Sequence, residues 1–434
     1  MKNTITFCVC ILVMVISASV ALAQQSTRQD TLKELMRRVD ILTQELEKAK
    51  LGEVAAETIY ESRFGMGPAA SRVYHLAKPG VSLAGYGEIA FQNFSSEKDD
   101  GSDSGAKNQI DFLRNIVYVG FRFNDWLLFN SEIEFEHAKT GEGAPGEVAI
   151  EFGYIEAKLH DAVSLRAGML LAPVGIINEF HEPSTFHGVL RPETERRIIP
   201  ATWRANGFGL VGGTSSGFGY KLYVVEGLNA AKFSSNGIRS ARQNGAKAVA
   251  EDFGFTGRFN YTGIAGLDVG GSFYTGNSGQ GLTDASGNAL DARLDLFSVH
   301  LLFARRGFEL RGLYAHSNIG DVSELNHALG LTGSGSIGDS QNGFYITAAY
   351  DVMPLFMKGA SHYLAPFIQY EQFNTQGDVP AGFSKNPARD RTNLTLGLTY
   401  KPHPNVAFKA DYINRDNDAN SAVDQFNLAV NYLF

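Results

Sequence analysis

Cysteine is nearly absent from this chain, whose 434 residues include only Cys8 and Cys10. Both lie close to the N-terminus, so the rest of the chain has no residue that can form a disulfide, bind a metal as a thiolate or act as a cysteine nucleophile. Positive charge is also scarce, because 38 lysines and arginines stand against 46 aspartates and glutamates. This balance argues against nucleic acid as a partner.

A long apolar run occurs only at the start of the chain. Lys2 precedes an apolar segment over residues 7–20, and residues 21–23 form a small-x-small pattern. These features predict a signal peptide, residues 1–23, cleaved after Ala23. An uncleaved membrane anchor is the alternative, but the run is shorter than the ~20 residues that a spanning helix needs. Cleavage leaves 38 − 1 = 37 basic residues against 46 acidic ones, a net charge of −9.

After this segment, no apolar stretch is long enough for a membrane helix. A membrane-spanning chain without such helices must be a closed β-barrel, because lipid cannot satisfy an open sheet edge. Glycine (47 residues) and phenylalanine (30 residues) are abundant, as close-packed strands and aromatic girdles require. Alternation between turn signals therefore predicts an all-β fold, a transmembrane antiparallel β-barrel of about sixteen strands over residues 81–434. The strands are predicted to begin near Val81, Ile110, Trp126, Glu147, Val163, Gly207, Gly219, Phe253, Leu267, Ala292, Phe308, Gly343, Tyr363, Thr392, Val406 and Ala422.

The predicted strands are apolar on one face and polar on the other, as a water-filled barrel in lipid requires. In the third strand, Phe129 and Phe135 share a face, whereas Glu132 and Glu134 share the opposite one. Short turns such as 124–125 and 401–405 alternate with long polar loops such as 95–108, 172–206 and 228–251. This asymmetry is typical of short periplasmic turns and long outer loops. Fourteen or eighteen strands remain alternatives, because the segment 352–361 is ambiguous.

The two ends of the mature chain suggest partners. Residues 426–434 alternate apolar and polar side chains up to the terminal Phe434, which resembles the strand read by the outer-membrane barrel assembly machinery; an edge strand of a soluble sandwich is the alternative. Near the other end, residues 24–51 are predicted to form a short periplasmic coiled-coil helix, followed by a linker over 52–80. Because so short a coiled coil is weak, we expect the barrel to bring the copies together, as a homotrimer. The alternative is an amphipathic helix on a surface or in the barrel plug. The seam residues are Leu32, Leu35, Val39, Leu42 and Leu46.

The third long connection, residues 172–206, is the longest one. Where it begins, residues 166–179 contain an Arg-x-Gly start and a Pro-x-Gly turn, and where it ends lies the stretch Arg204-Ala-Asn-Gly-Phe-Gly-Leu. Both stretches resemble the phosphate-selective porin family of Gram-negative outer membranes, over roughly residues 83–434. The resemblance implies an outer-membrane channel whose third outer loop folds inward to narrow the pore. It also implies contact with outer-membrane lipid and lipopolysaccharide.

Charged residues of this loop are the candidates for the constriction, because guanidinium groups stay charged and bind phosphate or carboxylate with two donors. The alternative is that they form salt bridges that hold the loop in shape. Strand phase adds further candidates on the inner wall, and both signs of charge are present. No ring of one sign is established, so we expect weak selectivity. The candidate pore residues are Arg191, Arg196, Arg197, Arg204, Glu193 and Glu195 in or next to the loop, and Arg114, Arg166, Arg258, Glu132 and Glu134 on the strands.

No enzymatic motif appears in the sequence. His-Glu-x-x-His and Gly-x-Ser-x-Gly are absent, and no histidine pair has metal-ligand spacing, so we expect no enzyme, no metal site and no cofactor. The leading hypothesis is a porin for passive diffusion of small hydrophilic solutes or ions, with a possible preference for anions or phosphate. A structural tether to the cell wall and a gated, substrate-specific channel are the alternatives.

Overall fold

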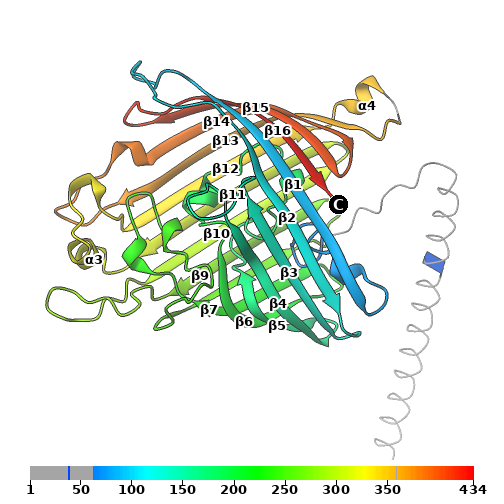
Figure 1. Cartoon of the computed structure of the whole chain (residues 1–434), viewed down its shortest axis with the longest axis horizontal. Helices are drawn as coiled ribbons and strands as arrows, with labels where there is room; N and C mark the ends of the chain where they lie inside the picture. Colours follow the sequence, from blue (N-terminus) through cyan, green and yellow to red (C-terminus); the bar gives the residue numbers. More distant parts are fainter. Residues whose placement is uncertain (1–37, 40–61, 358) are drawn as a thin grey trace, which may run out of the picture. The chain divides into compact units, whose positions relative to one another are not determined.

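The computed structural model describes residues 38–39, 62–357 and 359–434. In this part of the chain, sixteen antiparallel strands form a closed barrel in sequence order, as Figure 1 shows. The strands are β1 (Gly80–Phe94), β2 (Gln109–Arg122), β3 (Leu127–Glu136), β4 (Val148–His160), β5 (Val163–Leu171), β6 (Arg204–Gly213), β7 (Phe218–Glu226), β8 (Phe253–Tyr261), β9 (Leu267–Gly276), β10 (Leu294–Arg305), β11 (Phe308–Ile319), β12 (Ser340–Tyr350), β13 (Tyr363–Asp378), β14 (Asp390–His403), β15 (Val406–Asn417) and β16 (Gln425–Leu433).

The predicted barrel and its strand count are confirmed. The predicted starts differ from the observed ones by at most three residues, as at β6, predicted from 207 and observed from 204. The barrel closes where β1 pairs with β16, from Tyr86 opposite Leu433 to Phe94 opposite Gln425. The terminal Phe434 adds to this seam, because its N–H donates to the carbonyl of Gly85 at 2.9 Å.

Short helical segments occur in the connections. They are α2 (Thr194–Arg197), α3 (Val322–Ala328), α4 (Met353–Phe356), η1 (Arg72–His75), η2 (Pro183–Thr185), η3 (Ala230–Lys232), η4 (Arg239–Ala241), η5 (Gly333–Gly335) and η6 (Pro387–Arg389). None of the helices in the described residues is long and apolar enough to cross a membrane.

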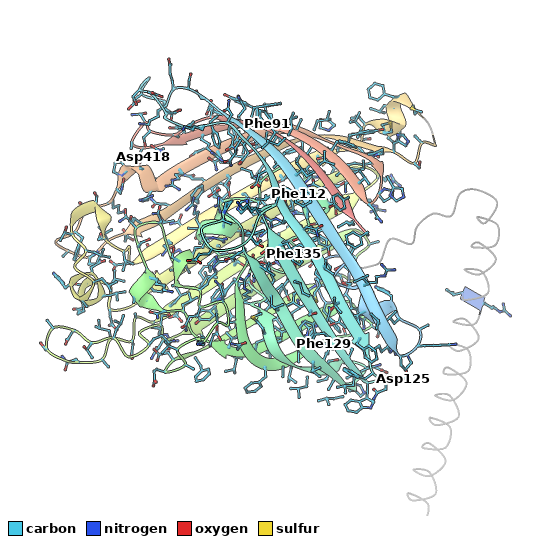
Figure 2. All side chains as sticks on the ribbon, viewed as in Figure 1. Phe91, Phe112, Asp125, Phe129, Phe135 and Asp418 are labelled. Carbon is cyan, nitrogen blue, oxygen red and sulfur yellow. The ribbon has the colours of Figure 1, made fainter. Side chains whose placement is uncertain are left out.

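Short turns and long loops lie at opposite ends of the barrel, with one exception: the connection between β12 and β13, residues 351–362, contains α4 and lies at the end with the short turns. Figure 2 shows Asp125, in the turn between β2 and β3, at one end, and Asp418, in the loop between β15 and β16, at the other. We call the end with the short turns the inner end and the end with the long loops the outer end. The C-terminus lies at the inner end, and α3 lies at the outer end (Figure 1).

The alternation along the strands sorts side chains between two environments. On β3, Phe135 is 41% exposed on the outer wall, whereas Glu132 and Glu134 are buried inside the barrel. On β14, Leu394, Leu396 and Leu398 are likewise exposed to the outside. A barrel with an apolar exterior and polar, inward-facing side chains is suited to lipid.

The interior is partly filled by three segments. Residues 172–203, between β5 and β6, fold inward, as predicted for the third outer loop, and we call this segment the third loop. Part of the loop between β7 and β8, with Phe233 and Ile238, is buried beside it. Residues 62–76, which fall within the predicted linker, pack into the inner end. Val73 is 1% exposed and packs against Gly120 of β2. A Cβ atom added to Gly120 would lie only 2.7 Å from the Val73 side chain, so the close contact requires glycine there.

Several predicted segments lie outside the described residues. They are the signal peptide (1–23), most of the coiled-coil helix (24–51), with Leu32, Leu35, Leu42 and Leu46, and the first part of the linker. Of the predicted seam residues only Val39 is described, and it is helical.

Candidate functional site

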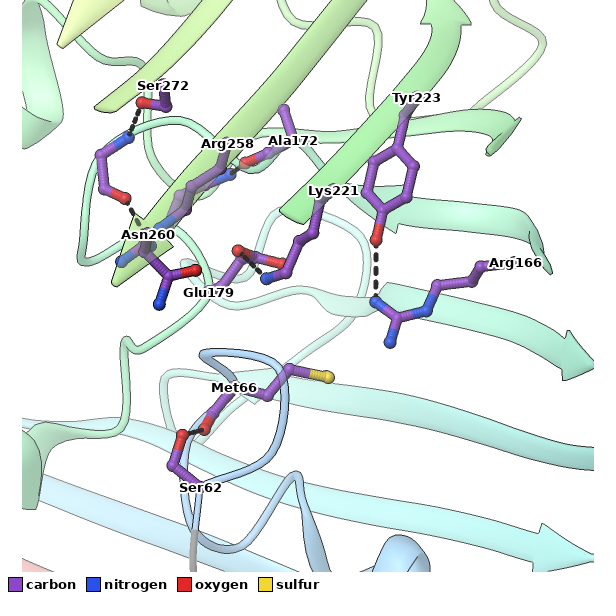
Figure 3. Close-up of polar contacts among 12 residues, drawn as sticks. Ser62, Met66, Arg166, Ala172, Glu179, Lys221, Tyr223, Arg258, Asn260 and Ser272 are labelled. Carbon is purple, nitrogen blue, oxygen red and sulfur yellow. Dashed lines mark hydrogen bonds and ion pairs between the residues drawn. The ribbon is translucent and has the colours of Figure 1, made fainter. Parts of the chain in front are cut away.

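The third loop is fixed at its start to the wall formed by β7, β8 and β9. Gly175 has φ +74°, a conformation that suits glycine. Its N–H donates to the Ser272 hydroxyl at 3.0 Å, and its carbonyl accepts from the Arg258 guanidinium at 3.0 Å. Lys221 of β7 forms a buried ion pair with Glu179. Figure 3 shows these contacts converging on the loop from neighbouring strands.

The middle of the loop contacts the opposite side of the barrel. Arg311 of β11 donates to the carbonyl of Thr185 at 2.7 Å, and Lys401 of β14 donates to that of Ser184 at 2.9 Å. Lys409 of β15 donates to the carbonyl of Gly188 at 2.9 Å. Because backbone groups of the loop bond to strands on both sides, the loop crosses the lumen as a fixed barrier.

The returning part of the loop is bonded to β12 and β13. The Glu371 carboxylate accepts from the N–H of Thr194 at 2.6 Å. The Glu195 carboxylate accepts from the Tyr345 hydroxyl and from the N–H groups of Ile176 and Ile177, at 2.7 and 2.6 Å. These bonds tie the return of the loop to its own beginning.

Cavities lie on both sides of this barrier. An outer vestibule of about 800 Å³ is open toward the long loops. On the inner side lie cavities of about 980 and 420 Å³, the larger lined by Lys221 and Arg258 and the smaller by Arg311. A neck of about 20 Å³ lies between the third loop and strands β13, β14 and β15. Its charged lining residues are Arg191, Arg415, Glu193, Glu371 and Asp411. Because Arg191, Glu193 and Arg415 also line the outer vestibule, the neck continues from it.

The outer vestibule carries an excess of positive charge. Among the described residues, its lining contains seven arginines and four carboxylates, an excess of 7 − 4 = 3 positive charges. The arginines are Arg114, Arg191, Arg196, Arg197, Arg239, Arg391 and Arg415, and the acids are Asp111, Glu136, Glu193 and Asp416.

Two of these arginines share one carboxylate. Arg196 lies 3.1 Å and Arg197 2.8 Å from the oxygens of Glu193. Burial alone would raise the pKa of Glu193, but the two guanidinium groups outweigh burial and lower it to about 2. Two further guanidinium nitrogens, Nη2 of Arg191 and Nη1 of Arg239, are buried without a hydrogen-bond partner in the described structure. Donors left without partners in a basic cavity suit an anion.

Comparison with known proteins places the chain in a family. The chain is 36% identical over 391 residues to an "Uncharacterized protein" of Aquifex aeolicus (strain VF5), a match that covers 88% of this chain and 86% of that protein. This chain belongs to the family of the Aquifex protein. No family model matches the chain.

Solved structures with a similar fold are outer-membrane proteins. Salmonella typhi OmpF, solved in complex with daunomycin, has a TM-score of 0.55 at 17% identity and covers 82% of this chain and 98% of its own. The anion-selective porin from Comamonas acidovorans has a TM-score of 0.53 at 12% identity, covering 82% of this chain and 100% of its own. The outer membrane channel DcaP of Acinetobacter baumannii has a TM-score of 0.50 at 14% identity, covering 82% of this chain and 98% of its own. At these identities the likeness concerns the fold: the chain has the fold of the outer-membrane porins, and membership of the phosphate-selective subfamily stays a prediction.

The predicted pore residues lie in three kinds of surroundings. Arg191, Arg196, Arg197, Glu193 and Arg114 line the outer vestibule, and Arg258 lines the inner cavity. By contrast, Arg166 forms a buried pair with Glu156 at 2.7 Å and holds Tyr74 of the N-terminal segment, while Glu195 is bonded within the third loop. Arg204, Glu132 and Glu134 are buried on the wall beneath the loop, where Arg204 lies 3.1 Å from Glu151.

Three arginines of the outer vestibule were missing from the sequence prediction. Arg391 and Arg415 have the same strand phase as the inward-facing Asn393 and Asp411, so the alternation could have identified them. Arg239 lies in the loop between β7 and β8, where no periodicity indicates which side chains face the lumen.

Proposed function

We propose that this chain is an outer-membrane porin, a passive diffusion channel for small hydrophilic solutes that prefers anions. The observation that carries the preference is the outer vestibule, with its seven arginines, four carboxylates and unpartnered guanidinium nitrogens. An entrance of one sign of charge raises the local concentration of oppositely charged solutes. The porin fold and the apolar outer wall support an outer-membrane location, in contact with lipid and lipopolysaccharide.

Two further parts of the proposal rest on the ends of the chain. The heptad seam over residues 32–46 supports a homotrimer. The alternation up to Phe434 supports recognition by the barrel assembly machinery, and Phe434 lies at the seam where the barrel closes.

The test is the reversal potential of purified protein in a planar bilayer under a salt gradient. We expect stepwise conductance increments and a potential whose sign shows anion preference. Replacing Arg196 and Arg197 by alanine lowers the charge excess of the vestibule from 7 − 4 = 3 to 5 − 4 = 1, so the preference should fall. The matched control replaces Arg305, the last residue of β10, and Arg306, the next residue in the inner turn; both are exposed. An unchanged reversal potential in the Arg196–Arg197 variant would show that these two residues do not determine the ion preference.

A gated or substrate-specific channel is the second candidate, and the neck of about 20 Å³ favours it. Such a channel would pass little current in simple salt until a suitable solute is added. The bilayer experiment separates the two, because a general porin conducts at once and a gated channel conducts only with its solute. Phosphate and a dicarboxylate are the first solutes to add, because both fit an arginine-rich vestibule.

A further inference from the structure

A histidine and two glutamates meet beneath the third loop. Glu132 comes from β3, Glu151 from β4 and His181 from the loop. Their side chains are at most 3% exposed, and one ligand atom from each lies within 4.8 Å of the others. The Nε2 atom of His181 lies 3.0 Å from Oε1 of Glu132 and 3.4 Å from Oε2 of Glu151. Three segments that are distant in sequence thus present one nitrogen and two carboxylate groups to the same buried point.

The other ring nitrogen of His181 determines the tautomer. Nδ1 lies 3.1 Å from the carbonyl oxygen of Asn178, which can only accept a hydrogen bond. Nδ1 therefore carries a hydrogen, and Nε2 directs either a lone pair or a second proton at the two carboxylates. In a neutral ring, the lone pair of Nε2 would face the negatively charged carboxylate oxygens and repel them. A cation must fill this point, either a proton shared between Nε2 and a carboxylate or a metal ion bound to both.

The carboxylates have bonding capacity that the protein does not use. Oε1 of Glu132 accepts from the Tyr118 hydroxyl at 3.3 Å. Oε1 of Glu151 accepts from Thr202 at 3.0 Å and from Arg204 at 3.1 Å. The Oε2 atom of each glutamate is buried and has no hydrogen-bond partner in the described structure. Buried carboxylate oxygens without donors are costly. Oε2 of Glu151 is also the oxygen that faces Nε2 of His181, so a metal ion bound to Nε2 would satisfy it; from Glu132 the oxygen that faces Nε2 is Oε1.

The two distances from Nε2 are compatible with a bound metal ion. Bonds of about 2.0 Å in a tetrahedral site place the ligand atoms about 3.3 Å apart. The two observed separations from Nε2, 3.0 and 3.4 Å, lie on either side of that value. A proton on Nε2 can point at one of the two oxygens, whereas a metal binds both. Three protein ligands leave the fourth position to water.

We propose that His181, Glu132 and Glu151 bind one divalent transition-metal ion, such as Zn²⁺, which fixes the third loop to the wall formed by β3 and β4. Imidazole and carboxylate ligands together suit the ions of this class. The sequence gives no sign of the site, because its ligands lie on three separate segments. The site is distinct from the outer vestibule, since it lies in the wall beneath the loop, but Arg191 of the vestibule interacts electrostatically with both of its glutamates. Zn²⁺ binding and anion preference are measured separately, so either proposal can fail without the other.

The test uses purified full-length protein without a histidine tag. The protein is treated with EDTA and then titrated with Zn²⁺ against a chromophoric chelator, and Co²⁺ serves as a spectroscopic probe. We expect one Zn²⁺ per chain in the wild type. His181→Gln should weaken binding at least about tenfold, because removing even an outer partner of a metal site costs that much.

Two further variants distinguish the metal from an ion pair. His187→Gln is the matched control, since His187 lies on the same loop and contacts one carboxylate, Glu309, at 3.1 Å; it should bind Zn²⁺ like the wild type. His181→Cys should retain Zn²⁺ and give Co²⁺ a sulfur charge-transfer absorption, because a thiolate replaces the ring nitrogen as a ligand.

Two results would overturn the proposal. One is no stoichiometric Zn²⁺ in the wild type, and the other is equal binding by wild type and His181→Gln. Either would identify the cluster as an imidazolium held by two carboxylates. If His181→Gln does not fold, as judged by circular dichroism, the Co²⁺ spectra of the wild type and of His181→Cys decide. A folded His181→Cys protein whose Co²⁺ complex shows no sulfur charge-transfer absorption would also count against the site.

Discussion

Glu195 is the residue on which the shape of the third loop should depend most. Its buried carboxylate accepts three hydrogen bonds, two at Oε2 from the N–H groups of Ile176 and Ile177 and one at Oε1 from the Tyr345 hydroxyl. The Glu195→Ala change would leave three buried donors without an acceptor. At about 1–3 kcal/mol for each orphaned donor, the loop would lose about 3–9 kcal/mol. The barrel should remain intact, because the hydrogen bonds between its strands are not involved.

Glu195→Gln provides a sharp control. Its amide oxygen can accept both backbone N–H groups, so those two bonds persist, and its amide nitrogen can donate to the Tyr345 oxygen, which reverses the third bond. Burial raises the pKa of Glu195 above its ordinary value, so the site disfavours the negative charge that glutamine removes. We therefore expect Glu195→Gln to behave like the wild type.

Single-channel recording and limited proteolysis measure the effect. In Glu195→Ala we expect a noisier current with a higher mean conductance and new cleavage within residues 172–203. The mobility of the folded barrel on a semi-native gel should not change. Identical recordings from the alanine and glutamine variants would refute the reasoning, as would a quiet, protease-resistant loop in the alanine variant.

Three further predictions concern charge and assembly. Arg191→Gln and Arg415→Gln, both at the neck, should each lower the anion-to-cation permeability ratio by up to about sixteenfold. A unit charge about 5 Å from an ion contributes about 0.8 kcal/mol even in water, which is about fourfold in favour of an anion and about fourfold against a cation. Reversal potentials measure this, with Arg306→Gln as the unaffected control. Glu193→Gln should increase anion preference, because it removes a negative charge from the vestibule. The pKa of Glu193 is lowered to about 2, so its carboxylate stays ionised from pH 8 to pH 4 and its ion pairs are lost only as the pH falls toward 2. Near pH 2 the difference between the variant and the wild type should therefore disappear. Deleting Phe434 should reduce the amount of barrel in outer-membrane fractions on immunoblots, with unchanged conductance of the molecules that insert.

The fold was predictable because the alternation along each strand separates lipid-facing from inward-facing residues. The same two-residue period recurs in every strand of the barrel. The predicted start of β6 shows the limit of this signal. Apolar and glycine alternation begins at Gly207, but pairing with β5 extends the strand back to Arg204, opposite Leu171. Strand boundaries therefore depend on the partner strand, which one segment of sequence does not reveal.

The site was less predictable than the fold. The third loop was identified by its length, and its vestibule arginines by their charge, but the sequence does not indicate which charges are paired. Glu195 and Arg166 have the same residue types as the vestibule charges and yet are fully engaged in buried bonds. The cluster around His181 joins three segments, so no spacing along the chain could predict it.

The contrast between the whole chain and its outer vestibule explains how an acidic protein can favour anions. The formal charge of the chain is −8, whereas the described lining of the vestibule has an excess of three positive charges. Charges farther away than about one Debye length, roughly 8 Å at physiological salt, are screened from an ion at the entrance. An ion in the outer vestibule therefore responds to the seven arginines and four carboxylates that line it and not to acidic loops at the rim. At the neck, Arg191 and Arg415 face the carboxylates of Glu193, Glu371 and Asp411, so the positive excess belongs to the vestibule. Net charge should accordingly be a poor predictor of selectivity in barrels of this family, and the charge of the residues around the third loop a good one.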